Sequence, residues 1–251
     1  MKLHGHFWGP LCGTLVGAAI IVAQSKTSAN PARSPTSSGD VAGEVSLFAA
    51  GSSHAETDAS KVVVWLVPFD AIRQTDVREE KNHYRLLQRN KRFEPGLLVV
   101  PVGSIVDFPN ADPWFHNVFS LYRGKRFDLG LYQAGTQRSV KFDRPGPSYL
   151  FCNIHPEMTS VVLAVDTPFF GISEKNGHYL IPDVPAGRYI LRVWHENAPQ
   201  ESLLNLQRSI EIDGENRTLP PISVPVVKQI ETTHKNKYGQ DYDPDATKTD
   251  Y

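Results

Sequence analysis

The sequence predicts an all-β protein, because short runs of β-branched and aromatic residues alternate with Gly, Pro, Asn and Asp turns. These runs occupy 62–67, 97–102, 105–108, 118–122, 149–151 and 161–165. With 251 residues, 40% of them hydrophobic, the chain can bury a substantial core. Helical features are confined to 75–90, where Asp76 and Glu79 have capping-box spacing. The end of that stretch, 84–88, could equally be a strand.

The two ends of the chain are predicted to lie outside the β units. Lys2, the apolar stretch 7–23 and the small residues around Ser25 are typical of an export signal, so we expect a signal peptide at 1–25. The stretch is shorter than the ~20 apolar residues of a membrane span, although an uncleaved anchor is the alternative. Segments 26–40 and 227–251 are polar, which favours a disordered linker and a disordered tail. We therefore expect a periplasmic or secreted protein with no membrane span after cleavage.

Charge and cysteine content narrow the function further. The 26 basic and 27 acidic residues nearly cancel, so no overall field would gather nucleic acid. After signal cleavage Cys152 is the only cysteine, and no disulfide can form within the chain. A lone thiol in an oxidising compartment tends to be oxidised unless it is buried or bound to a metal. Cys152 therefore needs a protected or liganded environment.

Two segments carry side chains that suit a metal ion. Segment 112–118, DPWFHNV, places His116 at the start of a predicted strand, and YLFCNIHPEM spaces Cys152, His155 and Met158 three residues apart. Taken singly, a Cys-x2-His pair arises often by chance and a buried Met usually fills a core. Taken together, thiolate and thioether suit Cu(I) and two imidazoles also suit Cu(II), whereas structural zinc is held by Cys and His alone. The donor set predicts one redox copper.

Around these donors the chain resembles the cupredoxins, and within them the plastocyanin and amicyanin group, over about 80–166. The resemblance rests on FEPGLLVVPVGSIVDFPN, on FHNV and on the Cys-x2-His-x2-Met loop, whose spacing is amicyanin-like. It implies a Greek-key β-sandwich with one type 1 (blue) copper. His116, Cys152 and His155 would be the equatorial ligands, and Met158 the weak axial ligand.

The same resemblance implies supporting residues and a function. Asn117 would hydrogen-bond to the ligand loop and hold it in place. The protein would carry single electrons through His155 to a redox protein, such as a periplasmic dehydrogenase or a cytochrome, as similar carriers do in methylamine utilization. The docking surface would be an apolar rim of Pro113, Trp114, Ile154 and Pro156. The chain departs from the family at two places. Ile154 stands where the family commonly has a proline, and the stretch LYRGKRFDLGLYQAG has no counterpart typical of the family. These departures leave the partner's identity open.

Two other function classes remain to be weighed. The protein could instead store or deliver copper, or bind a partner or glycan in the cell envelope; delivery sites tend to be exposed and rich in Met or Cys. Enzymatic activity is not expected, because the sequence has no Ser/His/Asp set or phosphate loop, and a metal with four ligands leaves no substrate position.

A second β unit flanks the first. The run FFGISEKNGHYLIPDVPAGRYILRVWHE from 169 predicts three strands joined by turns at 176–177 and 185–187. It resembles the carboxypeptidase regulatory-like, transthyretin-like sandwiches, whose opening strands look like GEVSLF at 43–48 and KVVVWLVPF at 61–69. We expect one small sandwich from 41–72 and 167–226 with the cupredoxin unit inserted. The alternative is two domains in series, 41–166 and 167–226.

Overall fold

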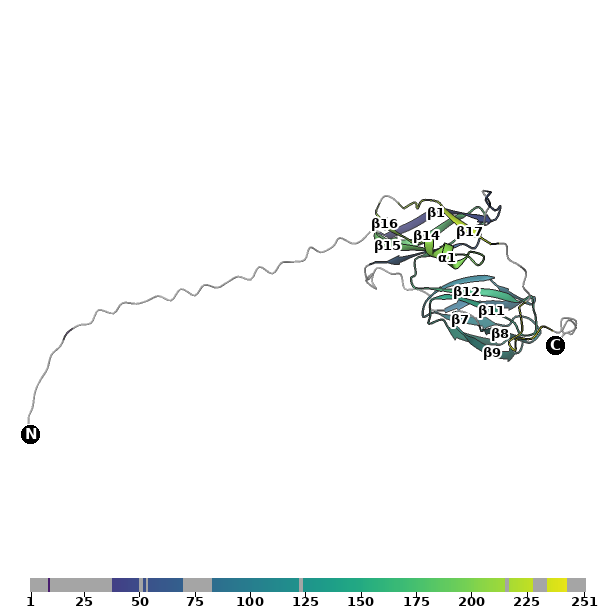
Figure 1. The fold of residues 1–251 in the computed structure, drawn as a ribbon. Helices are drawn as coiled ribbons and strands as arrows, with labels where there is room; N and C mark the ends of the chain where they lie inside the picture. Colours follow the sequence, from purple (N-terminus) through teal and green to yellow (C-terminus); the bar gives the residue numbers. More distant parts are fainter. Residues whose placement is uncertain are drawn as a thin grey trace, which may run out of the picture. The chain divides into compact units, whose positions relative to one another are not determined.

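The computed structural model describes residues 9, 38–49, 52, 54–69, 83–121, 124–214, 217–227 and 234–242. Within these residues the protein is all-β with one short helix (Figure 1). Apart from Gly9, the expected signal peptide lies outside the described residues, as do most of the expected linker and the helical alternative at 75–82. No helix in the described part of the chain is long and apolar enough to cross a membrane.

The strands group into two sandwiches, which we call the inner and the outer sandwich. The inner sandwich has a five-stranded sheet in the order β6-β12-β11-β8-β9, a three-stranded sheet β10-β7-β3 and the hairpin β4-β5. Its strands are β3 (His83–Arg85), β4 (Leu87–Arg89), β5 (Arg92–Glu94), β6 (Leu97–Pro101), β7 (Ile105–Pro109), β8 (His116–Ser120), β9 (Phe127–Tyr132), β10 (Gln137–Lys141), β11 (Gly146–Phe151) and β12 (Thr159–Val165).

The outer sandwich is assembled from both flanks of the inner one. It has the sheets β14-β1-β17 and β13-β2-β15-β16. Its elements are β1 (Ser38–Ala49), β2 (Val63–Pro68), β13 (Phe170–Ile172), β14 (His178–Pro185), β15 (Gly187–Trp194), α1 (Gln200–Asn205), β16 (Arg208–Ile212) and β17 (Ile222–Val226). β2 and β15 pair in antiparallel register, Val64 opposite Val193 and Pro68 opposite Tyr189. In the sequence, β2 precedes the strands of the inner sandwich and β15 follows them.

Each sandwich has its own core, because alternate residues of each strand face inward. The inner core contains Val106, Phe108, Val118, Leu150, Cys152 and Met158, among others. The outer core is built around Val64, Leu66, Ile181, Tyr189 and Leu191. A third cluster combines residues of β2 and β15 with residues of β6 and β12: Val63, Trp194, Val99, Val161, Leu163 and Val165.

Several expectations from the sequence change in detail. The end of the 75–90 stretch is strand, since β3 and β4 occupy it. β1 begins at Ser38, inside the expected linker. The turn at 176–177 forms, with Gly177 at φ 85° and its N–H donating to the carbonyl of Glu174. The strands on either side nevertheless join different sheets, β13 pairing with β2 and β14 with β1. The three strands predicted from 169 onward therefore alternate between two sheets, with β13 and β15 in one and β14 in the other.

Candidate metal centre

Three of the four expected donors meet at one end of the inner sandwich. His116 is the first residue of β8, and Cys152 and His155 lie in the loop 152–158 that connects β11 to β12. Phe151 pairs with both Phe119 of β8 and Thr159 of β12, so the strands bring the two ligand segments together. The ligand atoms of His116, Cys152 and His155 lie within 4.8 Å of one another, and all three residues are buried.

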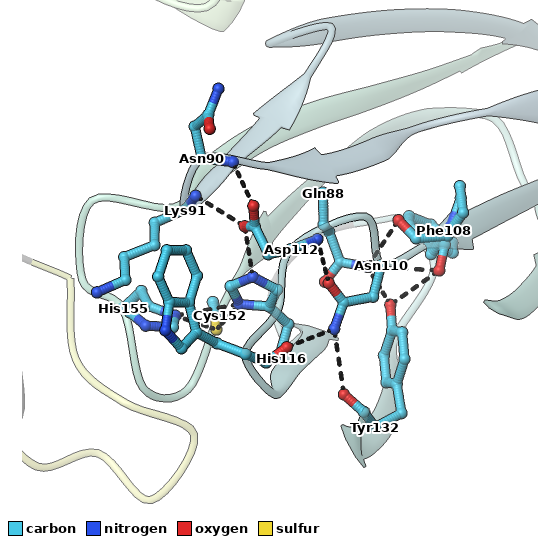
Figure 2. Close-up of polar contacts among 12 residues, drawn as sticks. Gln88, Asn90, Lys91, Phe108, Asn110, Asp112, His116, Tyr132, Cys152 and His155 are labelled. Atoms are coloured by element: carbon cyan, nitrogen blue, oxygen red, sulfur yellow. Dashed lines mark hydrogen bonds and ion pairs between the residues drawn. The ribbon is translucent and has the colours of Figure 1, made fainter. Parts of the chain in front are cut away.

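The nitrogen that each histidine turns inward is Nδ1. Cys152 Sγ lies 4.0 Å from Nδ1 of His116 and 3.7 Å from Nδ1 of His155, and the two Nδ1 atoms are 3.1 Å apart (Figure 2). The described residues thus converge on one thiol sulfur and two imidazole nitrogens. This donor chemistry fits a copper ion in either of its oxidation states.

Asp112 fixes the orientation of His116 by a hydrogen bond to Nε2, the ring nitrogen that does not face Cys152. Its Oδ2 accepts a hydrogen bond from His116 Nε2 at 2.8 Å, and a carboxylate can only accept, so the ring proton sits on Nε2 (Figure 2). Nδ1 of His116 is then left with its lone pair toward Cys152. Asp112 also accepts the backbone N–H groups of Asn90 at 2.6 Å and Lys91 at 2.9 Å. The β4-β5 turn, the carboxylate and the ligand therefore form one connected unit.

The charge state of Asp112 supports this role. Burial opposes ionisation of the carboxyl, but hydrogen bonds from Lys91, His116 and Asn90 together outweigh it and hold its pKa below the usual value. Asp112 is 4% exposed, so its charge is poorly screened by solvent. Sequence analysis did not single out Asp112. The available signal was its position four residues before His116.

Cys152 lies in a site that is apolar yet prepared for a thiolate. Burial raises the pKa of the thiol, while the backbone N–H groups of Asn117, Ile154 and His155 partly offset that rise. Hydrogen bonds to a charged form favour that form. The thiol is thus protonated in the metal-free protein, and the N–H groups are already in place for the thiolate that a metal would bind.

Both histidines favour the neutral form that binds metals. Burial lowers the pKa of His155 to about 4, assisted by electrostatic repulsion between its protonated form and both His116 and Lys91. Burial also lowers the pKa of His116, against the opposing effect of Asp112. Neither imidazole therefore has to lose a proton near neutral pH to act as a ligand.

Met158 and Asn117 were expected to complete the centre. Met158 is buried in the same core cluster as Cys152, and its backbone bonds close the loop: its N–H donates to His155 and its carbonyl accepts from Cys152. The side-chain amide of Asn117 donates to Asp128 Oδ1 at 2.7 Å. Its side-chain oxygen is buried without a partner. The link from Asn117 to the ligand loop runs through its backbone N–H, near the sulfur of Cys152.

The residues of the expected docking rim are not equally accessible. Pro113 is exposed, and Trp114 is partly buried with Lys91 Nζ 4.7 Å from its ring centre. Ile154 packs in part against the inner core. The carbonyl of Pro156 accepts a hydrogen bond from His234. Accessible apolar surface near the ligands therefore centres on Pro113 and Trp114, beside Phe115, which is 45% exposed and which sequence analysis did not single out.

A second group that sequence analysis missed comes from the polar tail. Residues 234–242, expected to be disordered, lie against the ligand loop. Their contacts reach Phe151, Cys152, Asn153, Pro156 and Asp128. The polar composition of this segment gave no sign that it packs on the protein, because it is held by hydrogen bonds and an ion pair rather than by buried apolar side chains.

Comparison with known proteins gives partial likenesses. No family model and no curated protein matches the chain. A Cu-containing nitrite reductase from Thermus scotoductus SA-01 is 22% identical with a TM-score of 0.32, over 33% of this chain and 22% of that chain. A purple cupredoxin from Nitrosopumilus maritimus is 22% identical with a TM-score of 0.30, over 32% and 98%. A reduced mutant of amicyanin is 18% identical with a TM-score of 0.32, over 41% and 98%. The function of this chain therefore has to be argued from its donor residues.

Proposed function

We propose that the chain binds one type 1 copper through His116, Cys152, His155 and Met158 and carries single electrons between redox partners outside the cytoplasm. The observation that carries the proposal is the convergence of one thiol and two imidazoles, all buried, within 4.8 Å. Bound copper would supply a reversible one-electron couple. The chain's own residues hold the donors in advance, so that little has to move on electron transfer.

The rigid setting of the donors favours a carrier over an enzyme. Asp112 holds one imidazole, three backbone N–H groups face the sulfur, and backbone bonds close the loop 152–158. With Met158 as the fourth donor, no ligand position would be left for a substrate. We therefore propose no catalytic reaction at this centre.

Burial of the donors also favours a carrier over a copper delivery protein. His116 and Cys152 are fully buried and His155 is 5% exposed. Handing a metal to another protein requires ligands that the recipient can reach and displace. Electron transfer has no such requirement, since the metal stays where it is.

For the partner, we propose a redox protein, such as a dehydrogenase or a cytochrome, that docks on the surface around Trp114. Redox encounters need only small interfaces. Location outside the cytoplasm follows from the expected export signal at 1–25 and is part of the same proposal. We also propose that the outer sandwich is of the transthyretin-like kind, which its sheets of three and four strands support.

The carrier function is tested by a reversible redox titration and by electron self-exchange in mixtures of the two oxidation states. We expect full recovery of the oxidised spectrum over repeated cycles without loss of copper. Trp114→Ala should slow self-exchange roughly tenfold with an unchanged spectrum, because large aromatic side chains dominate small interfaces. Leu180→Ala, which removes an exposed side chain of the outer sandwich, is the control. Release of copper on reduction would instead indicate storage or delivery.

A further inference from the structure

Residues 234–242, which we call the strap, contact the ligand loop at several backbone and side-chain positions. The hydroxyl of Tyr242 donates to the carbonyl of Cys152 at 2.7 Å. The backbone N–H of Lys237 donates to Asn153 Oδ1 at 3.0 Å. His234 Nε2 donates to the carbonyl of Pro156, and its ring lies 4.3 Å from that of Phe151 between centroids. The strap thus reaches from the residue before Cys152 to the residue after His155.

A second anchor of the strap leads toward the other ligand segment. Lys237 Nζ lies 2.8 Å from Asp128 Oδ2. The other oxygen of Asp128 accepts from the side chain of Asn117, the residue that follows His116. One residue of the strap is therefore bonded on one side to the loop of Cys152 and His155, and on the other to the strand pair that carries His116.

Within the described residues, the ligand loop is closed by backbone hydrogen bonds of its own and by N–H groups that face the sulfur of Cys152. The backbone hydrogen bonds run from Cys152 N–H to the carbonyl of Met158, at 3.2 Å, and from Met158 N–H to the carbonyl of His155, at 3.1 Å. The carbonyl groups of Cys152 and Pro156 take no part in these two bonds and accept hydrogen bonds from the strap. Because the strap belongs to the same chain, its docking is intramolecular and has a high effective concentration.

We propose that the strap holds the ligand loop in its donor geometry, with Tyr242 as the positioning residue for Cys152. The inference rests on the proposed copper centre but adds a part of the chain that no ligand motif contains. A docked strap restrains opening of the loop, so it shields the thiol in the metal-free protein and narrows the range of sulfur positions in the copper-loaded protein. A tail that merely rests on the surface would do neither.

The first test uses the full-length, metal-free protein and measures how fast Cys152 reacts with a disulfide reagent such as Ellman's. The triple substitution His234→Ala, Lys237→Ala and Tyr242→Phe removes the main side-chain contacts of the strap. We expect it to react roughly tenfold faster than the wild type, because each lost hydrogen bond lowers the free energy of loop opening. Tyr242→Phe alone should react about two- to fivefold faster.

Tyr238→Phe is the matched control. It removes the same hydroxyl group from the same segment, but Tyr238 is 71% exposed and its hydroxyl interacts with Lys237 of the strap rather than with the ligand loop, so we expect a rate close to that of the wild type. Circular dichroism of each variant verifies that the fold is intact. Equal thiol reactivity in the wild type, Tyr242→Phe and the triple variant would overturn the proposal.

The second test separates the strap from the copper assignment. In the copper-loaded protein we expect Tyr242→Phe to change the copper–sulfur absorption and the electron paramagnetic resonance spectrum, and Tyr238→Phe to leave both unchanged. A wild type that binds no copper would contradict the proposed function, while the thiol measurement would still decide the strap. A coloured wild type with identical spectra and thiol rates in all variants would reject the strap alone.

Discussion

At the scale of single residues, Asp112 has the clearest consequence for metal binding. Asp112→Ala would leave His116 Nε2–H and the backbone N–H groups of Asn90 and Lys91 without their acceptor. We expect copper affinity to fall about 10- to 100-fold, the usual effect of removing a hydrogen-bond partner behind a ligand. Competition with a chelator measures it.

Two further variants sharpen this prediction. Asp112→Asn retains an oxygen acceptor without the charge and should lose less affinity than Asp112→Ala. Asp107→Ala is the control. It removes a carboxylate that accepts a hydrogen bond from Ser139 within the sheet β10-β7-β3, and it should leave the copper affinity unchanged. Wild-type affinity in Asp112→Ala would contradict the positioning role.

His155 predicts how the stability of the metal-free protein depends on pH. Its pKa is about 4 in the folded chain and 6.5 when unperturbed, so the unfolded state binds more protons between these values. The free energy of unfolding should therefore decrease as pH falls from 6.5 to about 4, by on the order of 2 to 3 kcal/mol. Burial lowers the pKa of His116 as well, and it acts in the same direction.

Chemical denaturation of the metal-free protein at several pH values tests this. His155→Gln should flatten the dependence in that window, because the substituted side chain does not titrate. An equally steep dependence in His155→Gln would show that other groups cause it.

The ligands and their neighbours differ in how far the sequence predicts them. The convergence of Cys152 and His155 with His116 is predictable because their residue types and spacing are chemically particular, while the role of Met158 as a donor stays a prediction. Asp112 was not predictable, since an aspartate before a proline is also common in turns. For Asn117 the sequence does not predict which group makes the contact: its side chain turns to Asp128, and its backbone N–H faces Cys152.

At the scale of elements, β14 offers a test of the outer sandwich. Ile181 is fully buried in the outer core, whereas its neighbour Leu180 is 53% exposed on the opposite face of the strand. Ile181→Ala should lower the free energy of unfolding by about 2 to 5 kcal/mol through the cavity it leaves. Leu180→Ala should change it by less than about 0.5 kcal/mol. Urea denaturation of both variants checks the orientation of the strand, and similar losses would contradict it.

Most strands were predictable because their apolar runs are bounded by turn residues, as for β2, β6, β7 and β12. The pairing of the strands was less predictable from the sequence. A turn at Gly177 is visible in the sequence, but whether the next strand stays in the same sheet depends on long-range pairing of β1 with β14. The helix α1 escaped prediction because its six residues bury none of their side chains fully.

At the scale of the whole molecule, the chain enters the outer sandwich, builds the inner one and returns. The returning strand β15 pairs with β2, which precedes the inner sandwich in the sequence. The docking of the strap was not predictable from the sequence. Segment 227–251 has neither hydrophobic periodicity nor a strand pattern, and the strap is held mainly by hydrogen bonds.

The central claim is that one copper is bound through the sulfur of Cys152. The most direct measurement is a copper titration of the wild type and of Cys152→Ser, followed by visible absorption and electron paramagnetic resonance. We predict intense visible colour that saturates at one copper per chain in the wild type and is absent in Cys152→Ser. Equal colour in both proteins, or a wild type that remains colourless while binding zinc tightly, would contradict the account.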